Sequence, residues 1–358
     1  MRAAVLRDVR TPVEIEEVEL DDPSPHEVVI RTAAAGVCHS DLHFVEGLHH
    51  TDLPTVPGHE SAGVVERVGS DVRYVEPGDH VITCMSAFCG ECGVCTTGRP
   101  YLCESPEMQR TEGSRLRQGG SPMGQLYNLG SYAEQLLVHE RAVVKIREDM
   151  PLDRAALIGC AVMNGFGAVV NTAAVPFGSS VAVIGCGGIG LSAINGAAIT
   201  GAGQIIAIDV VPEKLELART FGATHIIDAG SVDPVDAVRD LTDGGVEYSF
   251  EAVGLKHTAE QAFAMLRWGG DATVIGMVPE GQTVSVPASD LLLEKTLRGS
   301  NMGSNRFRVD MPRLVDFYLD GKLHLDQLIS KRLGLDDINA AFAEMKAGSV
   351  ARSVIVFE

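Results

Sequence analysis

Residues 181–190 read Val-Ala-Val-Ile-Gly-Cys-Gly-Gly-Ile-Gly. The first four residues are apolar and predict a buried parallel strand. Gly185, Gly187 and Gly190 then follow with the spacing G-x-G-x-x-G. In that order the glycines permit a tight turn, let a pyrophosphate approach the backbone, and let the next helix pack closely on the strand. The N-terminus of that helix would offer free N–H groups to the phosphates.

A second apolar run, residues 204–208, ends in Asp209. This acid stands about 20 residues past the last glycine, where a carboxylate that binds a ribose 2′-hydroxyl is expected. A glycine-rich turn alone would not explain strand, glycines, helix, strand and acid in that order. We therefore predict a doubly wound dinucleotide-binding unit, with strands and helices alternating from about residue 175 onward.

The composition limits the function classes. The chain has 358 residues, of which 45% are hydrophobic and only 5% aromatic, and this favours a mostly aliphatic α/β core in two domains. Its formal charge of −19 opposes nucleic acid or an anionic membrane as a partner. The first residues lack the long apolar segment of a signal peptide, and no stretch approaches 18 uninterrupted apolar residues. We expect a cytoplasmic protein.

The rest of the chain predicts a second, β-rich domain with proline and glycine turns. Its expected strands are residues 3–6, 14–18, 28–33, 63–68 and 80–83. The nucleotide-binding unit should add strands near 225–227, 248–252 and 272–275, a helix from Pro212 to Gly222, and a helix at 258–266 that stops at Gly269-Gly270. Helices at 311–319 and 335–346 and a strand at 353–357 should return to the first domain. The predicted domains are therefore residues 1–161 with 302–358, and an inserted domain at 162–301.

Four cysteines in one short segment give the strongest metal signal: Cys89, Cys92, Cys95 and Cys103. In a long chain without a secretory signal, this spacing indicates metal rather than disulfides. Four thiolates close a tetrahedron, which favours a structural zinc ion. An iron–sulfur cluster is the rival, although such runs usually place proline after a closer fourth cysteine, whereas Glu104 follows Cys103.

A second set of metal ligands is scattered along the chain: Cys38, His59 and Cys160. Two thiolates and an imidazole make a catalytic zinc shell whose fourth position is free for water or substrate. The site would be neutral, and a bound alcohol would lose its proton easily and become the hydride donor. From spacing alone, Cys160 as a small core residue and His59 as a turn histidine remain open.

With these motifs, the sequence resembles the zinc-containing medium-chain alcohol dehydrogenases over nearly its whole length. The matching stretches are residues 36–43, 58–63, 77–81, 89–103, 159–160, 185–209 and 349–357. The resemblance implies an α/β fold, in which a GroES-like β-rich catalytic domain carries an inserted doubly wound Rossmann domain. It also implies two zinc ions per chain, NAD as coenzyme, and a homo-oligomer, with a dimer ahead of a tetramer.

Site residues are carried over from the family one by one. Cys38, His59 and Cys160 would hold the catalytic zinc, with Glu60 close behind it. Asp41 would orient His59, as a partner beyond a metal ligand commonly does. Ser40 would accept the alcohol proton, which passes through the nicotinamide ribose to His43. The implied coenzyme contacts are His39, Asn164, Gly185, Gly187, Gly188, Ile189, Gly190, Asp209, Lys214 and Arg352.

Two departures from the family pattern bear on the nicotinamide contact, the oligomeric state and the depth of the pocket, and the sequence does not fix the substrate. Asn164 stands where the family commonly has threonine, and the loop between Cys103 and Tyr132 is intermediate in length between the microbial tetramers and the animal dimers. Large side chains predict an apolar pocket, although core packing explains them equally well: Met85, Leu129, Tyr132, Met277 and Met302. We expect primary alcohols, medium-chain or aromatic, to be interconverted with aldehydes or ketones.

The alternatives come from three directions. Glutathione-dependent formaldehyde oxidation needs cationic groups for two carboxylates, and the candidates are Arg110, Arg115 and Arg117. Polyol dehydrogenases and zinc-free quinone reductases are disfavoured by the thiolate at Cys160 and by the two metal sets. A non-catalytic NAD-binding protein is disfavoured because every zinc ligand and both relay residues are present.

Overall fold

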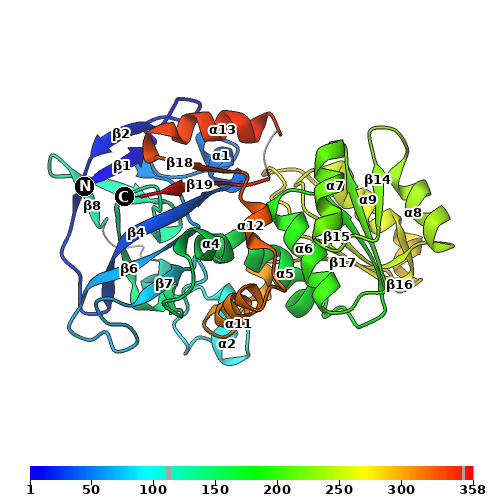
Figure 1. Cartoon of the computed structure of the whole chain (residues 1–358), viewed down its shortest axis with the longest axis horizontal. Coiled ribbons are helices and arrows are strands. Elements are labelled where there is room, and N and C mark those ends of the chain that lie inside the picture. The colour runs from blue at the N-terminus through cyan, green and yellow to red at the C-terminus, as the bar shows by residue number, and fades with distance from the viewer. Residues whose placement is uncertain (110–113, 349–350, 358) are drawn as a thin grey trace. The chain divides into compact units, whose positions relative to one another are not determined.

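The computed structural model describes residues 1–109, 114–348 and 351–357. Arg110, Glu112 and Gly113 of the intermediate loop, and Ser349 and Val350 of the last matching stretch, lie outside the described residues. The chain divides into two compact units, Met1–Cys160 with Asn305–Glu358, and Ala161–Ser304. Each unit is described separately below (Figure 1).

The first unit is built on a seven-stranded sheet in the order β11-β7-β6-β4-β19-β18, with β10 also pairing with β4. These strands are β4 (Glu27–Val37), β6 (Ser61–Val68), β7 (His80–Thr83), β10 (Gln135–His139), β11 (Val143–Lys145), β18 (Lys331–Leu333) and β19 (Ser353–Val356). The last strand, β19, runs antiparallel to β4, with Ser353 opposite Val37. The C-terminal segment therefore returns to the first unit, as expected from the sequence.

Smaller sheets and helices complete the first unit. β1 (Arg2–Val5) pairs with β2 (Glu14–Glu17), and a four-stranded sheet joins β3 (Glu19–Leu20), β8 (Leu116–Gln118), β9 (Ser121–Gln125) and β5 (Thr55–Val56). The helices are α1 (His39–Val45), α2 (Gly93–Thr96), α3 (Pro106–Gln109), α4 (Leu152–Leu157), α11 (Phe307–Leu319), α12 (Leu325–Leu328) and α13 (Ile338–Lys346). Helix α13 covers β4 and β19 through a core cluster in which Ile338 and Phe342 meet Ala35 and Ile355.

The second unit is a six-stranded parallel sheet in the order β14-β13-β12-β15-β16-β17. Its strands are β12 (Ser180–Ile184), β13 (Gln204–Asp209), β14 (His225–Asp228), β15 (Val246–Glu251), β16 (Leu266–Val274) and β17 (Thr296–Gly299). Its helices are α5 (Met163–Gly167), α6 (Gly188–Ile199), α7 (Pro212–Thr220), α8 (Pro234–Thr242), α9 (Lys256–Ala264) and α10 (Ala288–Leu291). In chain order this is the 3-2-1-4-5-6 arrangement of the Rossmann fold, so the predicted doubly wound unit is confirmed.

Several predicted boundaries were wrong: α11 begins at Phe307 rather than at residue 311, and β16 begins at Leu266 rather than near residue 272. β4 extends well beyond residues 28–33, because its small residues Ala34, Ala35 and Gly36 pair with β6 and β19 despite their weak strand preference. Gly269 and Gly270 lie inside β16 rather than at a helix end. The register between β15 and β16 shifts there, and Gly269 has φ of 74°, so the glycines form a bulge.

One helical run, Leu152–Thr172, is long and apolar enough by composition to cross a membrane, but 83% of its most apolar window is buried within the protein. That burial is typical of a core helix. The run also contains wider π-helical turns, one of them at Ile158–Val162. Such turns often occur at functional sites, and this one carries Cys160.

Candidate active site and metal centres

The three scattered ligands meet inside the first unit. Cys38 follows β4 and caps α1, His59 follows β5, and Cys160 lies in the π-helical turn. Their ligand atoms all lie within 4.8 Å of one another, and the Nε2 of His59 is 3.2 Å from the Sγ of Cys160. Each side chain is at most 3% exposed. Two sulfurs and one nitrogen facing a common point suit zinc and leave a fourth position for another ligand.

The orientation of His59 is fixed from its far side. Its Nδ1 lies 2.9 Å from the Oδ1 of Asp41, which also accepts the N–H of Gly58 at 3.0 Å. Because the Nδ1–H of His59 donates to Asp41, the imidazole presents its Nε2 toward the two sulfurs. The backbone of Gly58, whose N–H donates to Asp41, has φ of +97°, a conformation that L side chains rarely adopt.

An ion pair lies next to the metal cluster. Arg352 donates through Nη2 and Nε to the two carboxylate oxygens of Glu60, and both side chains are buried. Burial raises the pKa of Glu60 to about 7, although the guanidinium acts in the opposite direction. Contact with Cys160, together with the charge of Arg352, lowers the pKa of Cys38 well below its ordinary value. A lowered thiol pKa favours the thiolate, the form that ligates metal.

The predicted relay residues lie on α1 beside this cluster. The Oγ of Ser40 is 3.7 Å from the Sγ of Cys38. His43 stacks on His49, with ring centroids 5.9 Å apart, and its Nδ1 is buried without a hydrogen-bond partner among the described residues. Burial, and then repulsion from His49, lowers the pKa of His43. His39, the predicted pyrophosphate contact, is the first residue of the same helix.

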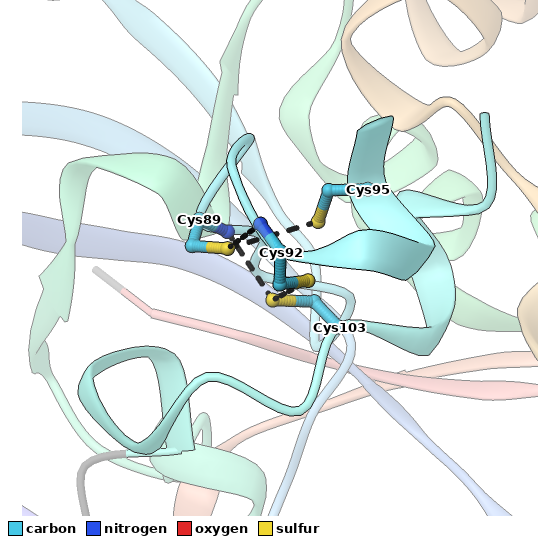
Figure 2. A group of neighbouring side chains, drawn as sticks. All are labelled: Cys89, Cys92, Cys95 and Cys103. Atoms are coloured by element: carbon cyan, nitrogen blue, oxygen red, sulfur yellow. Dashed lines mark hydrogen bonds between the residues drawn. The ribbon is translucent and has the colours of Figure 1, made fainter. Parts of the chain in front are cut away.

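The four-cysteine segment forms the second metal centre (Figure 2). The Sγ atoms of Cys89, Cys92, Cys95 and Cys103 lie within 4.8 Å of one another. Backbone N–H groups support the thiolates, because the Sγ of Cys89 accepts from Cys92 at 3.3 Å and the Sγ of Cys103 accepts from Cys89 at 3.3 Å. Donors from Glu91 and Cys92 lower the pKa of Cys89 to about 6. This donor set fits a closed tetrahedral zinc site.

In the second unit, the glycine turn has the geometry that its spacing predicts. Gly185 has φ of +93°, and a Cβ on Gly190 would lie 1.7 Å from the carbonyl oxygen of Gly185. Gly187 caps α6, and a Cβ there would meet only open space. The room that glycine leaves at the start of α6 is what a pyrophosphate needs.

The other residues of this unit that were predicted to contact the coenzyme lie around the same end of the sheet or on α5. Asp209 ends β13, where its carboxylate accepts N–H groups from Cys186 at 2.7 Å and Val210 at 2.8 Å. Gly188 and Ile189 begin α6, and Lys214 lies on α7. The amide of Asn164, on α5, lies 3.1 Å from the sulfur of Met302.

Comparison with known proteins identifies the family. An alcohol dehydrogenase GroES-like domain matches residues 24–148, and a zinc-binding dehydrogenase domain matches residues 188–319. The chain is 36% identical to S-(hydroxymethyl)glutathione dehydrogenase of Paracoccus denitrificans, over 99% of both chains. It belongs to the zinc-containing medium-chain alcohol dehydrogenase family.

Further relatives agree with this assignment. The dehydrogenase is 37% identical to alcohol dehydrogenase class-3 of Drosophila melanogaster, over 99% of its own length and 97% of the relative. It matches the crystal structure of benzyl alcohol dehydrogenase from Acinetobacter calcoaceticus with a TM-score of 0.94 at 33% identity, covering 100% of this chain and 99% of that one. The predicted GroES-like fold is thereby confirmed, and the cofactors are zinc and NAD.

Two of the predicted pocket residues were placed wrongly. Tyr132 is 0% exposed and Leu129 1% exposed, so both are core side chains rather than walls of an open pocket. Both belong to core clusters, Tyr132 with Phe342 and Leu129 with Leu136, in the connection between β9 and β10. The Tyr132 hydroxyl instead donates to the Oδ2 of Asp41 at 2.7 Å. Met85, Met277 and Met302 stay a prediction.

Sequence reasoning also missed two aromatic neighbours of the site. Tyr127 packs edge-on against His59, with ring centroids 5.4 Å apart, and does so from a backbone φ of 53°. His49 stacks on His43 and lies beside Phe44. In the sequence, Asn128 is the local signal of a turn here. In the structure, Tyr127 and Asn128 both have positive φ.

Proposed function

We propose that this dehydrogenase oxidises primary alcohols, medium-chain or aromatic, to aldehydes with NAD, and catalyses the reverse reduction. The observation that carries the proposal is the buried Cys38–His59–Cys160 cluster, with three ligand atoms within 4.8 Å. When bound, zinc supplies a Lewis acid that eases loss of the alcohol proton. The first unit would act as the catalytic domain and the second as the coenzyme domain, with boundaries near residues 161 and 302.

The chain's own residues would move that proton. Ser40 stands next to Cys38, where its Oγ would accept the proton and release its own, and His43 would be the final acceptor. NAD, when bound, would supply the hydride acceptor. Since its lowered pKa keeps His43 neutral at physiological pH, its imidazole can act as the acceptor. Glu60 and Arg352, paired and buried, would set the charge next to the metal. The predicted contact of Arg352 with the coenzyme stays a prediction.

A His43→Gln variant tests the relay. We expect alcohol oxidation to slow by up to about 100-fold near pH 7, because the general base is lost. The deficit should shrink as pH rises, because hydroxide can then accept the proton in place of the imidazole. Steady-state kinetics from pH 6 to pH 10 measure this, with His50→Gln as the exposed control. An unchanged pH–rate profile would remove His43 from the relay.

Coenzyme choice is assigned to Asp209. Its carboxylate would accept hydrogen bonds from the adenosine ribose and repel a 2′-phosphate at the same place. The next residues, Val210, Val211 and Pro212, supply no cation to offset that repulsion. NAD should therefore be preferred strongly over NADP, with Lys214 as a second ribose contact.

The substrate preference rests on an apolar surround of the metal cluster. Phe44 and Tyr127 lie edge to face 5.5 Å apart, and the Tyr127 ring also packs against His59. An apolar site gains roughly 0.8 kcal/mol for each methylene that it buries. The likeness to a benzyl alcohol dehydrogenase supports the aromatic choice.

A kinetic panel tests the proposal. We expect kcat/KM to rise from ethanol to hexanol and benzyl alcohol, with lower KM for the longer substrates. Each alcohol is assayed with NAD and with NADP, and the aldehydes with NADH. Equal efficiency with both coenzymes would overturn the role of Asp209. Absence of turnover with every alcohol would favour the non-catalytic NAD-binding alternative.

The second candidate is glutathione-dependent formaldehyde oxidation, the activity for which the Paracoccus relative is named. Two of its candidate cations are already paired: Arg115 with Glu27 at 2.8 Å, and Arg117 with Asp21 at 3.1 Å. Arg110 lies outside the described residues. Hydroxymethyl-glutathione should therefore be a poor substrate. If it exceeds the best simple alcohol tenfold in kcat/KM, this candidate replaces the first.

Association of copies is assigned to the exposed edge of the second unit. β17 ends the six-stranded sheet, and apolar side chains stand exposed nearby: Trp268 at 74% and Leu292 at 87%. An unpaired edge strand is a ready template for pairing with another chain. We therefore favour a dimer over a tetramer, and light scattering would decide between them.

The cysteines bear on the location of the protein. None of the eight forms a disulfide, which suits a cytoplasmic location. Cell fractionation would test that location.

A further inference from the structure

A buried chain of hydrogen bonds extends beyond the metal ligand His59. The Tyr132 hydroxyl donates to the Oδ2 of Asp41 at 2.7 Å, and the Oδ1 of Asp41 lies 2.9 Å from the Nδ1 of His59. All three side chains are at most 1% exposed. Water therefore does not compete for these bonds, and each one constrains its neighbour.

The position of the Tyr132 hydroxyl is set by the packing of the core. The ring belongs to the cluster under α13 and meets Phe342 edge to face at 6.2 Å. The backbone is held as well, because the N–H of Tyr132 donates to Pro57 and its carbonyl accepts from Ala4. A ring clamped in this way delivers its hydroxyl to one fixed point.

The two oxygens of Asp41 have different partners. Oδ1 serves both the Gly58 N–H and His59. Within the described part of the chain, Oδ2 receives its hydrogen bond from Tyr132. Without that donor, a fully buried carboxylate oxygen would lack a partner and the carboxylate could rotate about its terminal torsion. His59 would then lose the geometry that directs its Nε2 to the two sulfurs.

We propose that Tyr132 is a positioning residue for the catalytic metal, acting through Asp41 and His59. The proposal rests on the proposed function only in taking Cys38, His59 and Cys160 as the catalytic zinc ligands. The competing role is purely structural, since the carbonyl of Gly36 lies 3.3 Å from the same hydroxyl. The shorter distance and the negative charge of the acceptor favour Asp41.

The test is Tyr132→Phe, which keeps the ring in its core position and removes only the hydroxyl. We expect the Kd for zinc at the Cys38–His59–Cys160 site to rise by up to about 10-fold, the lower end of the range for removing a direct partner of a metal-bound histidine, because Asp41 itself remains. The four-cysteine site in the same molecule is the internal control, and its zinc should be retained as before. In cobalt-substituted protein, the visible bands of the three-ligand site should shift.

A second tyrosine and a second variant complete the design. Tyr74→Phe removes the hydroxyl that accepts from the backbone N–H of Lys145 at 3.4 Å, and zinc binding should not change. Asp41→Asn tests the same hydrogen-bond chain from the other end and should also weaken zinc binding. The double variant should lose little more than Asp41→Asn alone, because Tyr132 acts through Asp41.

The outcomes separate this proposal from the proposed function. Unchanged zinc affinity and cobalt bands in Tyr132→Phe would overturn it, and so would lower thermal stability with unaltered metal binding, because the hydroxyl would then serve Gly36. Additive losses in the double variant would also overturn it. These measurements need no alcohol turnover. They would therefore still test the role of Tyr132 if every alcohol in the substrate panel failed to react.

Discussion

Cys160→Ser abolishes alcohol oxidation while the protein stays folded: this is the largest effect on activity that we expect. Cys160 supplies one of three ligand atoms within 4.8 Å, and serine offers a poor ligand in place of a thiolate. A metal acting as a Lewis acid contributes several kcal/mol to transition-state stabilisation. Each 1.36 kcal/mol is tenfold in rate, so kcat/KM should fall by about 10³-fold or more.

Metal analysis and a matched cysteine make this test specific. Zinc content should fall from two ions to one per chain, with near-native circular dichroism and melting temperature. The control is Cys84→Ser, because Cys84 is fully buried and belongs to neither metal cluster. Burial raises the pKa of Cys84 to about 11, so its thiol stays protonated and inert. Full activity in Cys160→Ser would remove that residue from the catalytic site.

Cys89→Ser should produce the largest loss of stability. Its sulfur is one of four that converge in the segment from residue 89 to residue 103. A structural zinc site contributes binding free energy directly to folding. The surrounding segment contains only short helical turns, and its apolar cluster around Met108 is small. The metal therefore supplies most of the stabilisation of this segment. We expect the free energy of unfolding to fall by about 4 kcal/mol or more, as losses of a structural metal can.

Urea unfolding with and without a strong chelator measures this. Chelator should bring the wild-type midpoint down toward that of Cys89→Ser and leave the variant nearly unchanged. One zinc ion, at the three-ligand site, should remain in the variant. Iron with a brown visible band in the purified protein would instead support the iron–sulfur alternative. An unchanged unfolding midpoint would show that the four sulfurs hold no structural metal.

Local patterns were the part of this protein that sequence could predict. The glycines at residues 185–190, the strand ends and Asp209 follow from backbone geometry over a few residues, and the structure places them as expected. The four-cysteine centre is local as well, because its ligands lie within one short segment. Helix and strand periods are likewise local, so most elements were found, with errors where small residues or paired glycines carry a weak signal.

Only the tertiary structure decided which distant side chains meet. His59 and Cys160 are separated by 101 positions and Arg352 and Glu60 by 292, yet each pair is in contact. Tyr132 is a large side chain that suited a pocket wall, but the packed segment between β9 and β10 places it in the core, where its hydroxyl reaches Asp41. The sequence by itself determined the types of ligand and their local spacing. Which side chain faces which was decided by packing, because contacts between distant segments depend on sheet order and side-chain direction that no local pattern contains.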